Sequence, residues 1–141
     1  SSGTAIGVAP GAQWIAVKMF DDAGLSSYSV VHQSFQWLLD PDNNPNTNDL
    51  PDIVNNSWGY RTLVNQCFTE FQQDIQTLKA SGVAVVFSAG NEGPLDYTSV
   101  SPANYPESLA VGAVDDSLLI GDFSSRGPSA CGTGVYPTLA F

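Results

Sequence analysis

Basic side chains are scarce in this sequence of 141 residues, which has four Lys and Arg against 14 Asp and Glu, for a formal net charge of −10. A chain this acidic is a poor candidate for binding nucleic acid or an anionic membrane surface. Charged residues make up only 13% against 43% hydrophobic residues, which excludes a disordered chain. No apolar run of about 18 residues or more occurs, so the sequence offers no membrane span.

Cysteine is also rare, because only Cys67 and Cys131 are present and they allow at most one disulfide. Two unpaired thiols are the simpler expectation, whereas a bridge would favour an oxidising compartment. At ~150 residues per domain the length predicts one domain, whose core needs no metal or disulfide. The sequence opens without a basic and apolar leader and stops on an apolar stretch, which we interpret as two ends cut from a longer chain.

Short apolar runs alternate with amphipathic segments along the chain. Helices are expected over residues 26–39 and 70–80, and strands over 14–17, 53–54, 83–87, 109–114 and 122–124. Strands separated by helices indicate right-handed crossovers and a parallel sheet. The predicted fold class is therefore α/β, with a parallel β-sheet flanked by helices on both faces and incomplete at both ends.

An acidic loop is expected over residues 40–52, which contain four Asp, four Asn and three Pro. Oxygen-rich loops of this kind suit calcium. The spacing lacks the Gly and the terminal Glu of an EF-hand loop. A solvated acidic loop is therefore favoured over a calcium site.

A Gly-rich turn over residues 88–94 follows the most apolar predicted strand. A phosphate cradle is one interpretation, but the turn has neither the three spaced glycines of a dinucleotide site nor the Gly-Lys pair of a P-loop. A second interpretation is an oxyanion site, because an Asn amide such as that of Asn91 can donate to negative charge that develops during acyl transfer. Asn also tolerates tight turns, and the residue chemistry alone favours that plain role for Asn91.

Several short blocks of sequence carry a family resemblance. They are GVAPGA at 7–12, AVK at 16–18, DIVNNSWG at 52–59, SGV at 81–83, SAGNEG at 88–93, NYPES at 104–108, AVGAVD at 110–115 and DFSSRGP at 122–128. In this order the blocks resemble the subtilisin-like serine proteases (subtilases), and most nearly the bacillopeptidase F branch of that family. The resemblance covers nearly the whole chain.

The resemblance implies a secreted or periplasmic serine endopeptidase that hydrolyses peptide bonds in proteins, requires no cofactor and is compatible with structural calcium, for which residues 103–108 match a weak cation site. The family's His-Gly-Thr and Gly-Thr-Ser triad motifs are absent, and His32, in a predicted helix, does not match them. We therefore expect residues 1–141 to be the central part of one catalytic domain, inactive alone. Self-association, or missing parts supplied as separate chains, is expected as well. The alternatives are a catalytically dead peptide-binding homologue and a nucleotide-binding α/β domain.

The resemblance also assigns roles to individual residues. It places the oxyanion donor at Asn91 and the rim of the first specificity pocket at Glu92, where a carboxylate would repel acidic substrate residues. The base of that pocket falls near Val100 or Ser101, and Tyr28 falls near a more distant pocket. The substrate-binding residues implied are Gly24, Leu25, Ser26, Ser57, Trp58, Gly59, Ser88, Ala89, Gly90 and Glu92.

Overall fold

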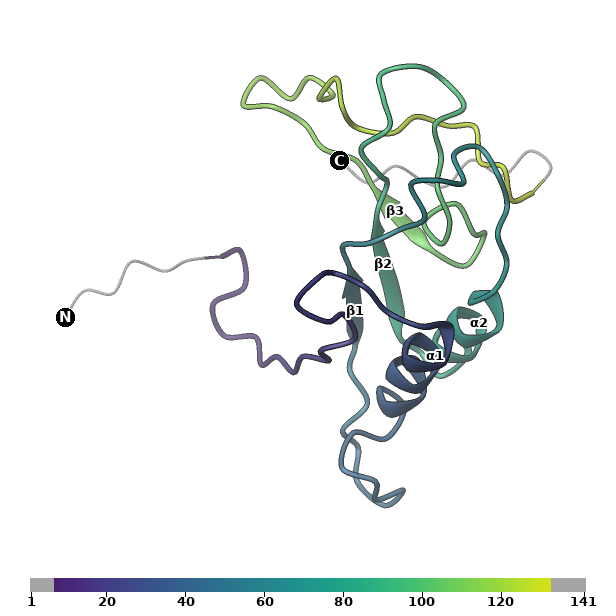
Figure 1. Cartoon of the computed structure of the whole chain (residues 1–141). Helices are drawn as coiled ribbons and strands as arrows, with labels where there is room; N and C mark the ends of the chain where they lie inside the picture. The colour runs from purple at the N-terminus through teal and green to yellow at the C-terminus, as the bar shows by residue number, and fades with distance from the viewer. Residues whose placement is uncertain (1–6, 133–141) are drawn as a thin grey trace.

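A computed structural model describes residues 7–132 of the chain. In chain order its elements are α1 (Tyr28–Trp37), β1 (Ile53–Asn56), α2 (Gln72–Ala80), β2 (Ala84–Ser88) and β3 (Leu109–Val111). The three strands form one parallel sheet in the order β1-β2-β3 (Figure 1). This arrangement confirms the predicted α/β class. Neither described helix has the length and apolar character that crossing a membrane requires.

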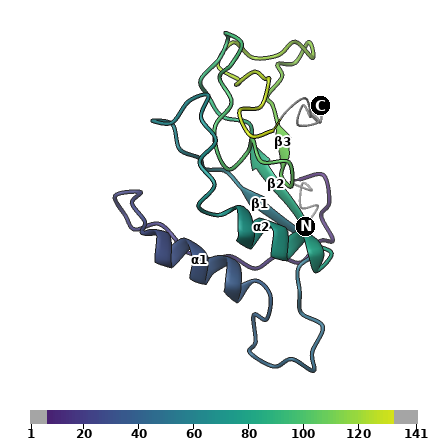
Figure 2. The same cartoon turned by 90° about the vertical axis from the view of Figure 1, so that its right-hand side faces the viewer.

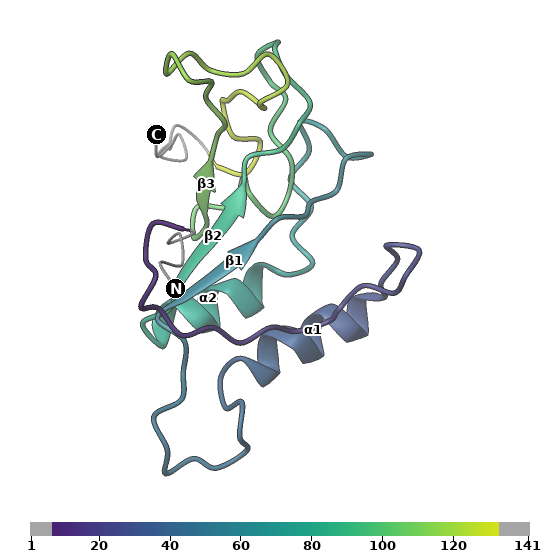
Figure 3. The same cartoon turned by 90° about the vertical axis from the view of Figure 1, so that its left-hand side faces the viewer.

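Both described helices lie on the same side of the sheet (Figures 1 and 3). Within residues 7–132 the helices therefore cover one face only, and cover for the second face stays a prediction. Side chains alternate across a strand, so Val54, Val85 and Phe87 point toward the helices and are buried. On the opposite face Ile53 is 63% exposed. One face of the sheet is thus packed and the other is open among the described residues.

Aromatic side chains fill the space between the sheet and the helices. Phe71, Ile75 and Leu78 recur at helical spacing and are fully buried, which explains why α2 packs on the sheet. Trp58 is half-buried at the centre of this layer. Five rings have centroids within 6.4 Å of the Trp58 ring: Phe20, Phe35, Tyr60, Phe71 and Phe87. The layer is a continuous core rather than a ligand site.

His32 of α1 is hydrogen-bonded to the start of the α2 region on both sides of its ring (Figure 2 shows the two helices). Its Nδ1 lies 2.8 Å from Asp74 Oδ2 and its Nε2 lies 3.3 Å from Glu70 Oε1. Partial burial lowers the pKa of His32, but the two carboxylates outweigh burial and raise the pKa above its ordinary value. His32 is therefore a structural link between the helices, in agreement with its expected place in a helix.

Cys67 and Cys131 form a disulfide, with Cα atoms 4.8 Å apart. The expectation of two unpaired thiols is wrong. The two residues are separated by 64 positions, so only the folding of the intervening chain brings them together. The bridge ties the loop that precedes α2 to the end of the described chain.

Two expected strands are absent from the sheet. Residues 14–17 have no regular secondary structure and pair with no strand of the described chain, and Trp14 is 84% exposed. Residues 122–124 form a turn, and the local pairing is instead an isolated antiparallel bridge between Val114 and Ile120. An apolar run becomes a strand only where a neighbouring backbone accepts its hydrogen bonds, and sequence does not reveal that neighbour.

Candidate functional site

The sheet brings two polar segments together at the carboxyl ends of its strands. Asn56 at the end of β1 pairs with Phe87 near the end of β2, so residues 57–59 and 88–90 leave the sheet side by side. Ser57 and Ser88 are both exposed there. In parallel α/β sheets this edge is where ligands bind.

The turn that carries Asn91 is held by backbone hydrogen bonds on both sides of that residue. Ser125 N donates to Gly90 O at 3.0 Å, and Glu92 N donates to Ser125 Oγ at 3.1 Å. One residue further on, Gly93 N donates to Phe123 O at 2.9 Å. Asn91 itself is exposed, and its side chain has no hydrogen-bond partner within residues 7–132. The turn therefore presents an amide donor to solvent on an anchored backbone.

Two glycines make this anchoring sterically feasible. Gly90 has φ of +109°, and a Cβ there would meet Ser125 Oγ at 2.6 Å and Val100 Cγ2 at 2.9 Å. A Cβ on Gly93 would meet Ser124 O at 2.2 Å, so the backbone itself would have to move. Glycine is required at both positions because the segment with Ser125 packs directly against the turn.

Trp58 contributes to the core more than to an open site. Its indole Nε1 donates to Asn56 Oδ1 at 3.1 Å, and Asn56 Nδ2 donates to Val86 O at 3.3 Å. These bonds lock the ring against the sheet. A ligand at this edge is therefore left mainly with the backbone of residues 57–59. A Cβ on Gly59 would meet Ser101 O and Val100 Cγ2 at 3.3 Å, so Gly59 allows that close packing.

A cavity of about 400 Å³ lies beside the anchored turn. Its lining residues are Ala89, Asp96, Ser99, Val100, Ala103, Asn104, Ala110, Ser125, Arg126, Gly127 and Pro128. Val100 contributes to this lining together with Ala89, whereas Ser101 does not. The Ser101 hydroxyl instead donates to Asn104 Oδ1 at 2.8 Å and accepts from Phe68 N at 3.0 Å.

The other predicted substrate edge, at Gly24, Leu25 and Ser26, lies in an exposed turn before α1. Asp21 Oδ1 shapes that turn by accepting from Ala23 N and Leu25 N at 2.9 and 2.8 Å. Leu25 is 67% exposed. The turn connects to the strand edge through the ring contact between Phe20 and Trp58, at 6.1 Å.

Tyr28, expected beside a distant pocket, packs its ring edge-on or tilted against other aromatic residues. Its contacts are Tyr60, Phe68 and Phe71, with centroids 5.8 to 6.3 Å away. Burial raises the pKa of Tyr60 to about 12.

Sequence reasoning missed two residues that the structure places at this edge. Ser125 is buried behind the turn, as described above. Arg61 Nε donates to Glu92 Oε1 at 2.8 Å, where the Glu92 side chain is 18% exposed and the Arg61 side chain 74%. The sequence feature that could have pointed to Arg61 is its position two residues after Gly59, in a sequence with only four basic residues.

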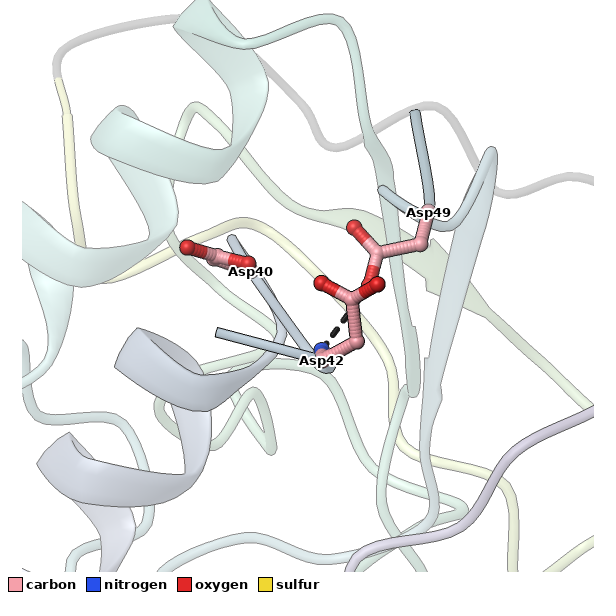
Figure 4. A group of neighbouring side chains, drawn as sticks. All are labelled: Asp40, Asp42 and Asp49. Atoms are coloured by element: carbon pink, nitrogen blue, oxygen red, sulfur yellow. Dashed lines mark hydrogen bonds between the residues drawn. The ribbon is translucent and has the colours of Figure 1, made fainter. Parts of the chain in front are cut away.

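Three carboxylates lie close together in the acidic loop. Oxygens of Asp40, Asp42 and Asp49 lie within 4.8 Å of one another (Figure 4). Asp49 Oδ2 accepts from Asp42 N at 2.9 Å, and Asp40 and Asp42 both accept from Asn44 N. These turn-forming hydrogen bonds account for the cluster, and exposed acidic groups are common without an ion.

Backbone carbonyls in the expected weak cation site at residues 103–108 already accept hydrogen bonds from the protein. Asn104 O accepts from Ser129 Oγ at 2.6 Å, and Tyr105 O accepts from Ser108 N at 3.1 Å. Those carbonyls serve the loop's own hydrogen bonds.

Several known proteins are similar to this chain in sequence. Residues 1–141 match the model of the Subtilase family. The chain is 39% identical over 133 residues to bacillopeptidase F of Bacillus subtilis (strain 168), covering 88% of the chain and 9% of that protein. It is 34% identical over 140 residues to subtilisin E of the same organism, covering 95% of the chain and 34% of that protein.

Solved structures give the same fold. The structure titled Sphericase superimposes with a TM-score of 0.64 at 22% identity, over 77% of this chain and 34% of that one. The prenylagaramide maturation protease PagA does so with a TM-score of 0.61 at 26% identity, over 77% and 36%. The chain thus spans about a third of subtilisin E and a smaller part of bacillopeptidase F. The match along its whole length shows that the chain belongs to the subtilase family.

Proposed function

We propose that this chain is the central part of the catalytic domain of a subtilisin-like serine endopeptidase. In this role it supplies the oxyanion donor and two substrate-binding segments, while the triad residues belong to other segments of the domain. The observation that carries the proposal is the exposed Asn91 amide on a turn whose neighbours Gly90 and Glu92 are both bonded to Ser125.

The chemistry follows from that anchoring. When a serine attacks a peptide carbonyl, the carbonyl oxygen becomes negatively charged. A donor that is already in place stabilises this charge without reorganising during the reaction. The bonds to Ser125 restrict Asn91 in this way, because neither flanking peptide unit can rotate without breaking one of them.

Substrate binding is proposed for the segments beside the donor. An extended peptide can add to residues 57–59 as a further strand, since Ser57 and Gly59 leave that backbone accessible. The side chain before the cleaved bond would enter between these residues and 88–90, toward the cavity that Val100 lines. The turn at Gly24, Leu25 and Ser26 would contact more distant substrate residues.

The substrates would be peptides and proteins, and the compartment extracellular or periplasmic. The Cys67–Cys131 disulfide supports the compartment, because such bridges persist where the environment is oxidising. No cofactor takes part in the proposed chemistry.

Replacing Asn91 in the complete catalytic domain tests the proposal. Asn91→Ala is expected to lower kcat by ~10²–10³-fold with little change in KM, a size taken from subtilisin, the reference case for removal of one oxyanion donor. The matched control is Asn48→Ala, which removes the same amide from an exposed position in the acidic loop.

The outcomes separate the alternatives. An unchanged kcat for Asn91→Ala would show that Asn91 is only a turn residue. A complete domain that binds peptides but never cleaves them, and that resists a serine-directed fluorophosphonate, would support a catalytically dead homologue instead.

A further inference from the structure

Arg61 joins the two segments that the proposed function places on either side of the substrate. Arg61 lies two positions after Gly59, and its Nε donates to Glu92 Oε1 at 2.8 Å. Glu92 directly follows Asn91 in the anchored turn. The ion pair therefore crosses the entrance between the two segments rather than lying along one of them.

Both ends of this ion pair are attached to ordered backbone. On the Arg61 side, Tyr60 N donates to Ser101 O at 2.9 Å. On the other side, Glu92 N donates to Ser125 Oγ at 3.1 Å. The two backbone segments are therefore held in positions from which the Arg61 and Glu92 side chains can reach each other.

The charge balance of the chain makes this pairing informative. Glu92 is largely covered at 18% side-chain exposure, so an unpaired carboxylate there would act on a neighbouring charge with little screening. The chain has only four basic residues against 14 acidic ones. Of these four, Lys18 pairs with Asp22, and Arg126 donates to the carbonyls of Ser124 and Gly121.

We propose that Arg61 is a specificity-determining residue, which neutralises Glu92 at the rim of the first specificity pocket and so allows acidic substrate residues before the cleaved bond. This inference rests on the proposed function. Without Arg61, the Glu92 carboxylate at the rim would be expected to repel acidic substrate residues and attract basic ones. Pairing with Arg61 changes that expected preference. Arg61 acts through Glu92 and is a positioning residue, not a catalytic one.

The test uses the complete catalytic domain and three peptides that differ only in carrying Glu, Gln or Lys before the cleaved bond. Values of kcat/KM are measured for the wild type and for Arg61→Gln, Arg61→Lys, Glu92→Gln and the double variant Arg61→Gln/Glu92→Gln. Arg61 is 74% exposed, so its replacement is not expected to disturb folding, and thermal unfolding of each variant verifies this.

Arg61→Gln is expected to raise the Lys-to-Glu ratio of kcat/KM by on the order of 10-fold, the effect of one uncovered charge at close range. The Gln peptide should be cleaved as before, and Arg61→Lys should restore most of the wild-type ratio. In the Glu92→Gln background Arg61→Gln should leave the ratio unchanged, because no rim charge remains to uncover.

Two results overturn the role of Arg61 while leaving the proposed function in place. One is an unchanged ratio in Arg61→Gln, and the other is an equal change in the Glu92→Gln background, which would mean that Arg61 acts on the substrate directly. Failure of the wild type to cleave any of the three peptides refutes the proposed function itself, and the role of Arg61 with it.

Discussion

Removing the Cys67–Cys131 disulfide is expected to lower the free energy of unfolding by about 4 kcal/mol. The bridge closes a loop of 64 residues. In the chain-entropy model, a cross-link across a loop of that length removes about 14.5 cal/mol/K from the unfolded chain, or about 4.3 kcal/mol at 25 °C. This is a large share of the ~5–15 kcal/mol by which domains are stable.

The perturbation is the double variant Cys67→Ala/Cys131→Ala, which avoids both a free thiol and a hydroxyl at the buried Cys131 position. Urea unfolding followed by far-UV circular dichroism gives the midpoint and slope for this variant and for the oxidised wild type. Reductant should destabilise the wild type by a similar amount and should leave the double variant unchanged, which is the internal control.

A double variant within about 1 kcal/mol of the oxidised wild type would refute the reasoning. That result would mean either that the bridge does not form or that the unfolded chain already keeps the two ends close. Mass spectrometry of the wild type with and without alkylation distinguishes these two causes.

Three further predictions concern the pH dependence, the surface and the activity of this chain. The pKa of His32 is raised in the folded state, so the ionised His32 side chain stabilises the fold fully below about pH 6.5, and this stabilisation is lost as pH rises through the raised pKa. The difference in urea midpoint between the wild type and His32→Gln should therefore shrink from pH 5.5 to pH 8.5. Because Ile53 is 63% exposed on the open face of the sheet, the chain should self-associate at micromolar concentration, and Ile53→Asp should shift sedimentation toward the monomer; equal sedimentation of the two would contradict this. Residues 1–141 alone should neither cleave a chromogenic peptide nor react with a fluorophosphonate, because the triad motifs are absent from the sequence; labelling that survives repurification would contradict this.

Local features of the fold were predictable because short-range rules govern them. The helix expected over residues 26–39 appears as α1, with the Ser27 side chain accepting from Val30 N at its start. The apolar run over 83–87 appears as β2, and Gly82 ends the helix before it, as expected. The roles proposed for Asn91 and its neighbours rest on the order of the motifs rather than on any single residue, because the chemistry of an isolated Asn favours a plain turn.

The sequence by itself determined the α/β class, the elements α1, α2, β1, β2 and β3, and the family, because these depend on periodicity, capping residues and the order of short motifs. Tertiary structure alone decided which distant groups meet: Cys67 with Cys131, Arg61 with Glu92, and Ser125 with the turn that carries Asn91. It also decided that residues 14–17 stay outside the sheet and that, within residues 7–132, α1 and α2 cover the same face. The physical reason is common to all of these, since a disulfide, an ion pair or a strand pairing needs a partner that chain folding must first bring within a few ångströms.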